Sequence, residues 1–156
     1  MNEISLRPVT PDDREFLLTV FAASRAIELS MVPWDADQKR AFCEHQLDAQ
    51  TSYYQEKYPD ARHDLILDGI LPVGRLYVDR TPDEIAILDV AVLLEHRGRG
   101  IGTHVISSLI DEAAESTRSV AVYVESYNPS QKLFVDLGFK TGADDGVNVH
   151  LVWRPA

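Results

Sequence analysis

The chain has 156 residues, enough for one domain with a substantial buried core. Its hydrophobic fraction of 45% and charged fraction of 26% are those of an ordinary globular protein, and no apolar run reaches the about 20 residues of a membrane-spanning helix. The formal net charge of −10 argues against a nucleic-acid-binding surface, which needs an excess of Lys and Arg. This charge is typical of a solubilising surface, and it indicates more weakly a preference for cationic substrates.

The cysteine content, the first residues and the lack of repeats indicate the compartment and the domain organisation. Cys43 is the single cysteine, which excludes an internal disulfide and suits a reducing compartment. The first residues lack the basic and then apolar pattern of a secretion signal. No repeat, low-complexity tract or linker divides the sequence. We therefore expect a cytoplasmic protein with a single domain over residues 1–156 and no membrane contact.

The first part of the chain predicts one strand followed by two helices. Residues 4–7 alternate apolar and polar side chains, which is typical of an edge strand. Thr10 followed by Pro11 and two acidic residues indicates the start of a helix, with apolar residues at helical spacing behind it. A second helix is expected from about Gln38 to Tyr58, where Pro59 ends it.

The middle of the chain predicts a hairpin, a buried strand and an amphipathic helix. Strands at residues 64–67 and 73–78 flank Asp68-Gly69, a dipeptide that favours a tight turn. The run 85–94 is almost continuously apolar, as in a central strand buried on both faces. The period then changes, and residues 102–116 have the apolar spacing of a helix.

The last part predicts a strand at residues 120–124, a short helix from Asn128-Pro129 to Gly138, and a strand at 147–153. Strand, helix and strand in succession imply a right-handed crossover between parallel strands, while the front half supplies antiparallel hairpins. The fold class is therefore a mixed α/β domain.

The most informative segment is the loop Arg97-Gly98-Arg99-Gly100-Ile101-Gly102 between the buried strand and the helix. Its glycines lack Cβ atoms, so the backbone can curl and direct N–H groups at one point, where the helix N-terminus adds further free N–H groups. Such an arrangement binds phosphate, and the arginines add positive charge. The spacing is one residue short of the dinucleotide-binding fingerprint, and the P-loop lysine is absent.

Two motifs in this order resemble the GNAT superfamily of acetyltransferases. The family pattern R/Q-x-x-G-x-G/A is matched by Arg97, Gly100 and Gly102. Residues 128–139, N-P-S-Q-K-L-F-V-D-L-G-F, are similar to the family's closing signature N-P-A-x-x-L-Y-x-x-x-G-F. The resemblance is close over residues 88–139 and extends in the order of elements over residues 6–153.

The resemblance implies a fold and a cofactor site. The fold is a central mixed, mostly antiparallel sheet, flanked by helices, whose parallel fourth and fifth strands splay apart. The pantetheine arm of acetyl-CoA would enter this wedge as an added strand, against the backbone of Ala91, Val92 and Leu93. The pyrophosphate would be held by the loop and helix start: Arg97, Gly98, Arg99, Gly100, Ile101, Gly102 and Thr103. Asn128, Ser130 and Phe134 would face the cofactor from the other side.

Some of these residues have simpler interpretations. Asn128 before Pro129, with Gln131 three residues on, also fits a capping box at a helix start. Ser130 stands where the family usually has alanine, and either a pantetheine contact or solvent would suit it. The family's tyrosine acid corresponds to Phe134, which has no proton to give.

Candidate acid–base groups are Asp89, Glu125 and Tyr123. Asp89 interrupts an apolar strand, so it is either a base acting through water or a carboxylate satisfied by backbone or a neighbouring cation. Glu125 ends its strand where the crevice should open. Tyr123 and Tyr127 could replace the missing tyrosine, and each also fits a structural role.

The acceptor is expected to enter past the first two helices, beside Glu28, Trp34, Gln46 and Tyr53. No metal site is predicted, because Cys43-Glu44-His45 has no second ligand pair at suitable spacing. The resemblance implies an N-acetyltransferase that uses acetyl-CoA and the primary amine of a small molecule. A non-catalytic acyl-CoA-binding or sensory module is the alternative, a nucleotide-binding regulator is a third reading, and a homodimer is left open.

Overall fold

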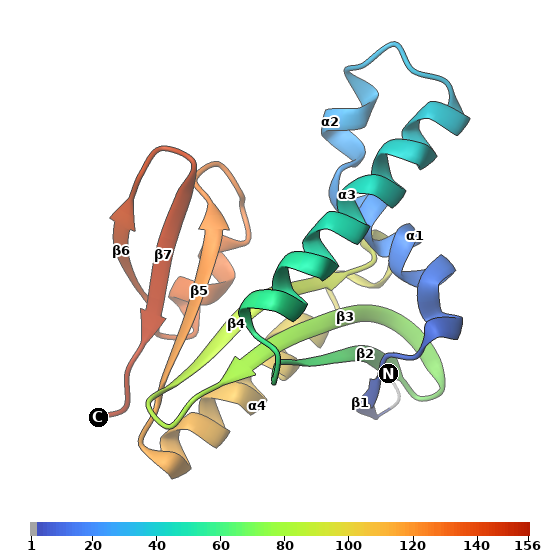
Figure 1. Ribbon diagram of the computed structural model, residues 1–156. Coiled ribbons are helices and arrows are strands. Elements are labelled where there is room, and N and C mark those ends of the chain that lie inside the picture. Colours follow the sequence, from blue (N-terminus) through green and yellow to red (C-terminus); the bar gives the residue numbers. More distant parts are fainter. Residues whose placement is uncertain (1–2) are drawn as a thin grey trace.

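The computed structural model describes residues 3–156, and these form a single mixed sheet flanked by helices (Figure 1). The strand order is β1-β2-β3-β4-β5-β7-β6, and every neighbouring pair is antiparallel except β4 and β5. This confirms the expected fold class. The strands are β1 (Ile4–Pro8), β2 (Arg62–Asp68), β3 (Leu71–Arg80), β4 (Glu84–Val92), β5 (Ser119–Glu125), β6 (Lys140–Asp144) and β7 (Asn148–Trp153).

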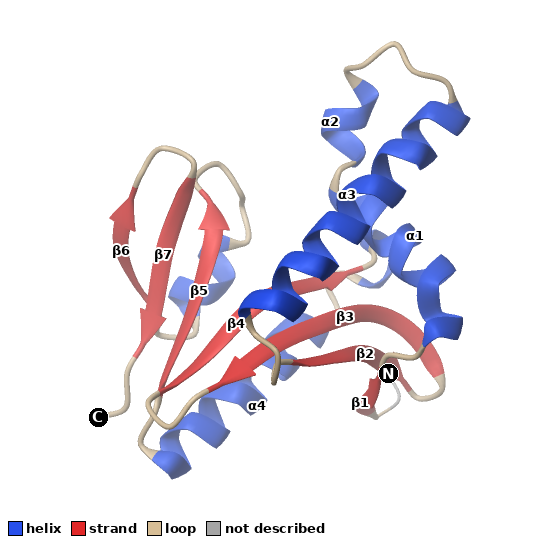
Figure 2. Ribbon diagram, in the orientation of Figure 1, coloured by secondary structure: helices blue, strands red, loops and turns tan. Residues whose placement is uncertain are grey.

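The helices cover the two faces of the sheet and enclose two apolar cores (Figure 2). One core joins α1 and α3 to β2, and the larger one joins α4 and α5 to β3, β4, β5 and β7. The α-helices are α1 (Arg14–Ser24), α2 (Ala26–Ser30), α3 (Ala36–Lys57), α4 (Ile101–Ser116) and α5 (Gln131–Asp136), with 3-10 turns at Pro11–Asp13 and Leu94–His96.

Local sequence explains where most of these elements begin and end. Helix α3 starts after Asp35, whose carboxylate accepts the N–H of Gln38 at 2.8 Å, while the Gln38 Oε1 accepts the N–H of Asp35 at 3.0 Å. This capping box starts the helix two residues before the expected position. Gly69 in the β2–β3 turn has φ 64°, the left-handed conformation that glycine adopts readily.

Two elements were absent from the sequence expectations. Helix α2 is a single turn, and β6 has all five residues exposed, so neither shows a periodic apolar pattern. Strand β4 also ends at Val92 rather than Leu94, because residues 94–96 turn away as a 3-10 helix. The expected burial on both faces is wrong, since only Ile85 and Ile87 of this strand are buried and its other residues are half-buried. These differences leave the order of the expected elements unchanged.

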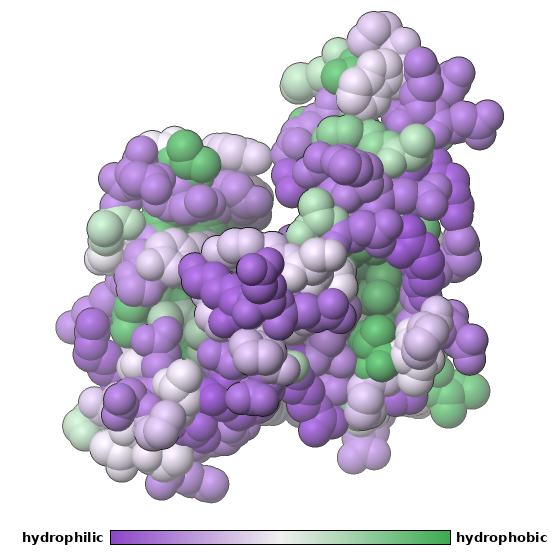
Figure 3. Space-filling model, in the orientation of Figure 1, coloured by the Kyte–Doolittle hydropathy of each residue, from purple (hydrophilic) through white to green (hydrophobic). Residues whose placement is uncertain are grey.

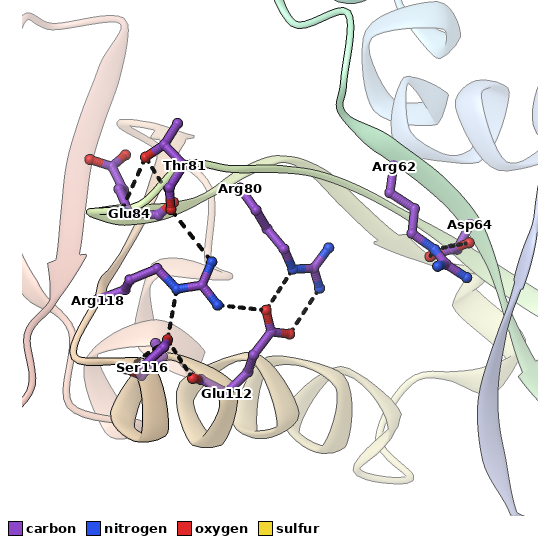
Figure 4. A network of polar contacts seen from close by, with 9 residues as sticks. Arg62, Asp64, Arg80, Thr81, Glu84, Glu112, Ser116 and Arg118 are labelled. Carbon is purple, nitrogen blue, oxygen red and sulfur yellow. Dashed lines mark hydrogen bonds and ion pairs between the residues drawn. The ribbon is translucent and has the colours of Figure 1, made fainter.

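An ion-pair network stabilises the end of the sheet at which β4 begins (Figure 4). The Glu112 carboxylate on α4 binds Arg80 of β3 at 2.6 Å and Arg118, which precedes β5, at 3.0 Å. The Arg80 guanidinium, with Arg118, holds the pKa of Glu112 below its usual range. At this end, β3, α4 and the start of β5 are therefore held together, and Glu84 of β4 pairs with Ser119 of β5.

Candidate active site

Strands β4 and β5 form a wedge because they pair over only part of their length. The last pair joins Ile87 to Val122. Beyond it β4 continues to Val92 alongside β3, and β5 continues to Glu125 alongside β7. Figure 2 shows the β5–β7–β6 part diverging from the β1–β4 part at this point.

A β-bulge in β4 lies at the point of divergence. Tyr77 of β3 pairs with Asp89, but the next residue, Val78, pairs with Ile87, so Leu88 is the extra residue. A bulge leaves its extra residue outside the ladder and bends the strand. The bend directs the last residues of β4 away from β5.

The free edge of β4 presents backbone groups to the wedge. The Leu93 N–H donates to the Val73 carbonyl at 2.8 Å, so Leu93 and Val73 form a hydrogen-bonded pair that extends the β3–β4 ladder. Hydrogen-bonded pairs alternate in an antiparallel ladder, so Ala91 also turns its backbone toward β3, while Val90 and Val92 turn theirs toward the wedge. Both backbone groups of Leu93 are engaged, because its carbonyl accepts the N–H of His96. The groups available for a ligand are thus the N–H and carbonyl of Val90 and the N–H of Val92, because the Val92 carbonyl accepts the Arg97 Nε.

The glycine loop lies at the open end of this edge. Gly98 and Gly100 have φ values of 77° and 80°, and a Cβ built on either would meet nothing within 4 Å. Arg97 is tied to the edge strand, since its Nε donates to the Val92 carbonyl at 2.8 Å. Arg99 is exposed. The loop is therefore a curled, open backbone segment with positive charge beside the wedge.

The start of α4 adds free hydrogen-bond donors to the loop. Gly100 is the N-cap, and its carbonyl accepts the N–H of His104 at 2.9 Å. Within residues 3–156, the N–H groups of Ile101, Gly102 and Thr103 have no acceptor, as expected for the first turn of a helix. Together with the helix dipole, these donors form an anion-binding arrangement.

The opposite wall of the wedge begins at the end of β5. The Asn128 carboxamide accepts the N–H of Ser130 at 2.9 Å and donates to the Glu125 carboxylate at 3.0 Å. The expected capping box is wrong: the Gln131 side chain donates to the carbonyls of Glu125 and Ser126 instead. These carbonyls lie where β5 ends, so Gln131 supplies the donors that a continuing strand would have supplied.

Phe134 occupies the core rather than the surface of the wedge. Its ring is 2% exposed and packs edge-on against Phe139, with ring centroids 5.2 Å apart. In this structure its role is packing between α5 and the sheet.

Comparison with known proteins places these features in a family. A model of the acetyltransferase (GNAT) family matches residues 25–139. The chain belongs to the GNAT family. No curated protein matches the sequence.

Several solved structures have the same fold as this GNAT domain. The PaiA N-acetyltransferase of Thermoplasma acidophilum, solved with coenzyme A, is 14% identical with a TM-score of 0.72, over 97% of this chain and 99% of that one. An acetyltransferase of Thermus thermophilus is 22% identical with a TM-score of 0.68, over 99% and 97%. RimL, a ribosomal alpha-N-protein acetyltransferase also solved with coenzyme A, is 15% identical with a TM-score of 0.66, over 99% and 96%.

Two acid–base candidates of the GNAT domain have defined surroundings. The Asp89 carboxylate accepts the Arg75 Nε at 2.5 Å, and Arg75, only 2% exposed, also donates to the Gln50 side chain at 2.6 Å. Asp89 is therefore satisfied by a neighbouring cation, one of the two alternatives left open by the sequence. Tyr123 is 69% exposed and stacks on His150 with centroids 4.5 Å apart.

The acceptor-side candidates come from α2, α3 and the segment between them, and one face of the molecule is hollowed between these helices and the β5–β7–β6 part (Figure 3). Helix α2 lies across this hollow from the end of β5 (Figures 1 and 3). The Glu28 carboxylate of α2 accepts the hydroxyl of Tyr127, which follows β5, at 3.5 Å. Trp34 packs against Phe42 with centroids 5.3 Å apart and remains partly exposed.

The two α3 candidates are placed differently from each other. Tyr53 is exposed and accepts the Lys57 ammonium at 3.0 Å, whereas Gln46 is half-buried. Sequence reasoning missed two inward-facing residues of this helix, Gln50 and Tyr54. Their spacing from the buried Leu47, at i+3 and i+7, is the signal that could have found them.

Residues 3–156 contain neither a metal-binding cluster nor a membrane-spanning helix. No group of three or more His, Cys, Asp and Glu side chains is arranged to hold a metal ion. None of the helices in this range has the length and apolar character needed to span a membrane.

Proposed function

We propose that this protein transfers the acetyl group of acetyl-CoA to the primary amine of a small acceptor. The observation that carries the proposal is the wedge with a free β4 edge, which opens onto a glycine loop and a helix N-terminus. The N–H and carbonyl of Val90 would bind the amides of the pantetheine arm as a neighbouring strand does. The N–H groups from Gly98 to Thr103 would bind the pyrophosphate. Family membership and the relatives solved with coenzyme A support this assignment.

The reaction forms a C–N bond and breaks a C–S bond at the thioester carbonyl. The neutral amine attacks the carbonyl carbon and negative charge develops on its oxygen, for which the Val92 N–H is the proposed donor. The amine then loses one proton, and Asp89 is the proposed acceptor through a water molecule. The electron pair of the broken bond leaves on sulfur, and a thiol with a pKa near 8.5 departs without a dedicated acid.

The other two candidates are less suited to the proton transfer. Glu125 is hydrogen-bonded to Asn128, and the Tyr123 ring lies on His150 in contact with solvent. Asp89 is also paired, with Arg75, but it lies on β4 next to Val90 and its side chain is 28% exposed.

The acceptor would enter between α2 and the end of β5, with Trp34, Gln46 and Tyr53 on the same side. The Glu28 carboxylate, which contacts Arg25 at 3.4 Å and Tyr127 at 3.5 Å, would bind its amine.

One observation favours a second function, an acyl-CoA-binding module without catalysis. Phe134 stands where the family usually has a tyrosine acid, and it is buried. Such a module would bind acetyl-CoA but release no thiol in the presence of amines.

Thermal-shift measurements test both. Acetyl-CoA is expected to raise the melting temperature, and ATP and NAD are expected to leave it unchanged, because only ligands that bind the native state stabilise it. Release of free thiol with a panel of small amines then separates the enzyme from the module. No shift at millimolar acetyl-CoA would exclude both functions.

A further inference from the structure

Tyr54 of α3 reaches the point where β4 and β5 diverge. Its hydroxyl donates to the carbonyl of Leu88, the bulge residue, at 2.8 Å. The ring is half-buried and lies edge-on against Tyr77 of β3, with centroids 5.0 Å apart. The ring contact fixes where the hydroxyl can lie. The reaction as described above does not use this residue.

The hydrogen bond from Tyr54 to the Leu88 carbonyl replaces the one that a neighbouring strand would otherwise donate. Leu88 is the first β4 residue beyond the last pair with β5, and the bulge takes it out of the β3 ladder as well. A buried carbonyl without a donor is costly, so an unpaired Leu88 would favour closing or rearranging the strand. The Tyr54 hydroxyl satisfies this carbonyl and so stabilises the diverged conformation.

The same contact sets the direction of the backbone groups that follow. Val90 and Val92 come two and four residues after Leu88 on the same edge of the strand. Rotation of the Leu88 peptide would turn the bulge and change where their N–H groups point. A donor that has to meet a developing negative charge loses its effect when it is misplaced.

We propose that Tyr54 is a positioning residue for acyl transfer: by holding the bulge carbonyl of Leu88, it orients the free edge of β4 toward the thioester carbonyl. This inference rests on the proposed function. It assigns Tyr54 no proton transfer. Burial, with a smaller contribution from the Asp89 carboxylate, raises the pKa of Tyr54 to about 12. The hydroxyl therefore remains a donor at the pH of any ordinary assay.

The test compares Tyr54→Phe with Tyr58→Phe. Both residues lie on the same side of the end of α3, and their rings neighbour each other, but Tyr58 has no contact with β4 among the bonds of residues 3–156. Phenylalanine keeps the ring contacts and removes only the hydroxyl. The Tyr54 variant is expected to lower kcat at least tenfold and to weaken coenzyme A binding, measured by calorimetry, by a clearly smaller factor, because the phosphate-binding loop is unchanged. The Tyr58 variant is expected to match the parent in both.

The split between kcat and coenzyme A affinity separates positioning from a structural role. A Tyr54→Phe protein with parental kcat, measured well below its melting temperature, would overturn this inference alone. An equal loss of coenzyme A binding and turnover would overturn it as well, because it would indicate a damaged fold. If Tyr54→Phe does not fold, Tyr54→Met fills the space without a donor and is assayed in the same way. Failure of the parent to bind coenzyme A would overturn the proposed function, and this inference with it.

Discussion

Replacing Gly100 with valine tests the phosphate-binding loop most directly. Gly100 has φ 80° and an open space where a Cβ would lie. Valine would be strained there by about 1–2 kcal/mol, because β-carbon-bearing residues avoid the left-handed region. Its methyl groups would also fill the space that we assign to the pyrophosphate. The first effect lowers stability, and the second lowers cofactor affinity.

Gly146 provides a matched control for the strain. It lies in the β6–β7 turn with φ 87°, and a Cβ there also meets nothing within 4 Å. Gly146→Val and Gly100→Val should therefore lose similar amounts of stability. At about 2–4 °C per kcal/mol for a domain of this size, the melting temperature should fall by about 2–8 °C in each. Only the Gly100 variant should lose affinity for acetyl-CoA.

The size of the affinity loss follows from the donors involved. A hydrogen bond to a charged group contributes about 1.5–3 kcal/mol, so loss of two phosphate bonds weakens binding at least about a hundredfold. At acetyl-CoA a hundredfold above the parental Kd, the parent gains about 2.7 kcal/mol, or about 5–11 °C. The Gly100 variant should gain about 1–2 °C under the same conditions. Binding within threefold of the parent, or an equal loss in Gly146→Val, would refute the phosphate role.

Three further predictions concern one buried and two half-buried side chains. Phe134→Ala should lower the free energy of unfolding by about 3–5 kcal/mol in urea titrations, because a ring that is only 2% exposed is lost. Phe134→Tyr should also destabilise the protein, since its hydroxyl would be buried. An unchanged urea midpoint for both variants would contradict the buried position of Phe134. Asp89→Asn should lower the free energy of unfolding by about 3 kcal/mol, because it leaves the buried Arg75 without its carboxylate partner. The same change should lower kcat about a hundredfold while coenzyme A still binds. Normal turnover would rule out Asp89 as the base. Burial, with the charge of Arg75, lowers the pKa of His63 to about 4, so the unfolded chain binds the extra proton and stability falls as pH drops from about 6.5 to 4. This loss, up to about 3 kcal/mol, should be smaller in His63→Gln, and identical pH dependence of the two proteins would exclude His63 as its source.

The features that sequence reasoning predicted are those that leave a local mark. The glycine loop could be placed because two of its residues need left-handed backbone angles, and glycine adopts them without strain. Helix α4 was recognisable because its buried positions repeat at helical spacing. In both cases the residues that reveal the structure are close together in the chain.

The remaining parts of the site depend on pairings between distant residues. Arg75 meets Asp89 and Gln50 across separations of 14 and 25 residues, and no local pattern announces either partner. Tyr54 reaches Leu88 over 34 residues. The sequence directed attention to the exposed neighbour Tyr53 instead, because helix position alone does not say which tyrosine faces a bulge. Strand β6 lies at the sheet edge with both faces exposed, so selection for burial leaves no alternation in its sequence.

The free edge of β4 also bears on how far such a sequence can diverge. A ligand recognised through backbone N–H and carbonyl groups makes few demands on side chains, provided that each residue preserves the bulge and the strand. Substitutions among apolar residues at Val90 or Val92 therefore leave the recognising atoms in place. Sequence change in related proteins would be restricted chiefly at the glycines of the loop and at the residues that hold β4 bent, and far less along the strand itself.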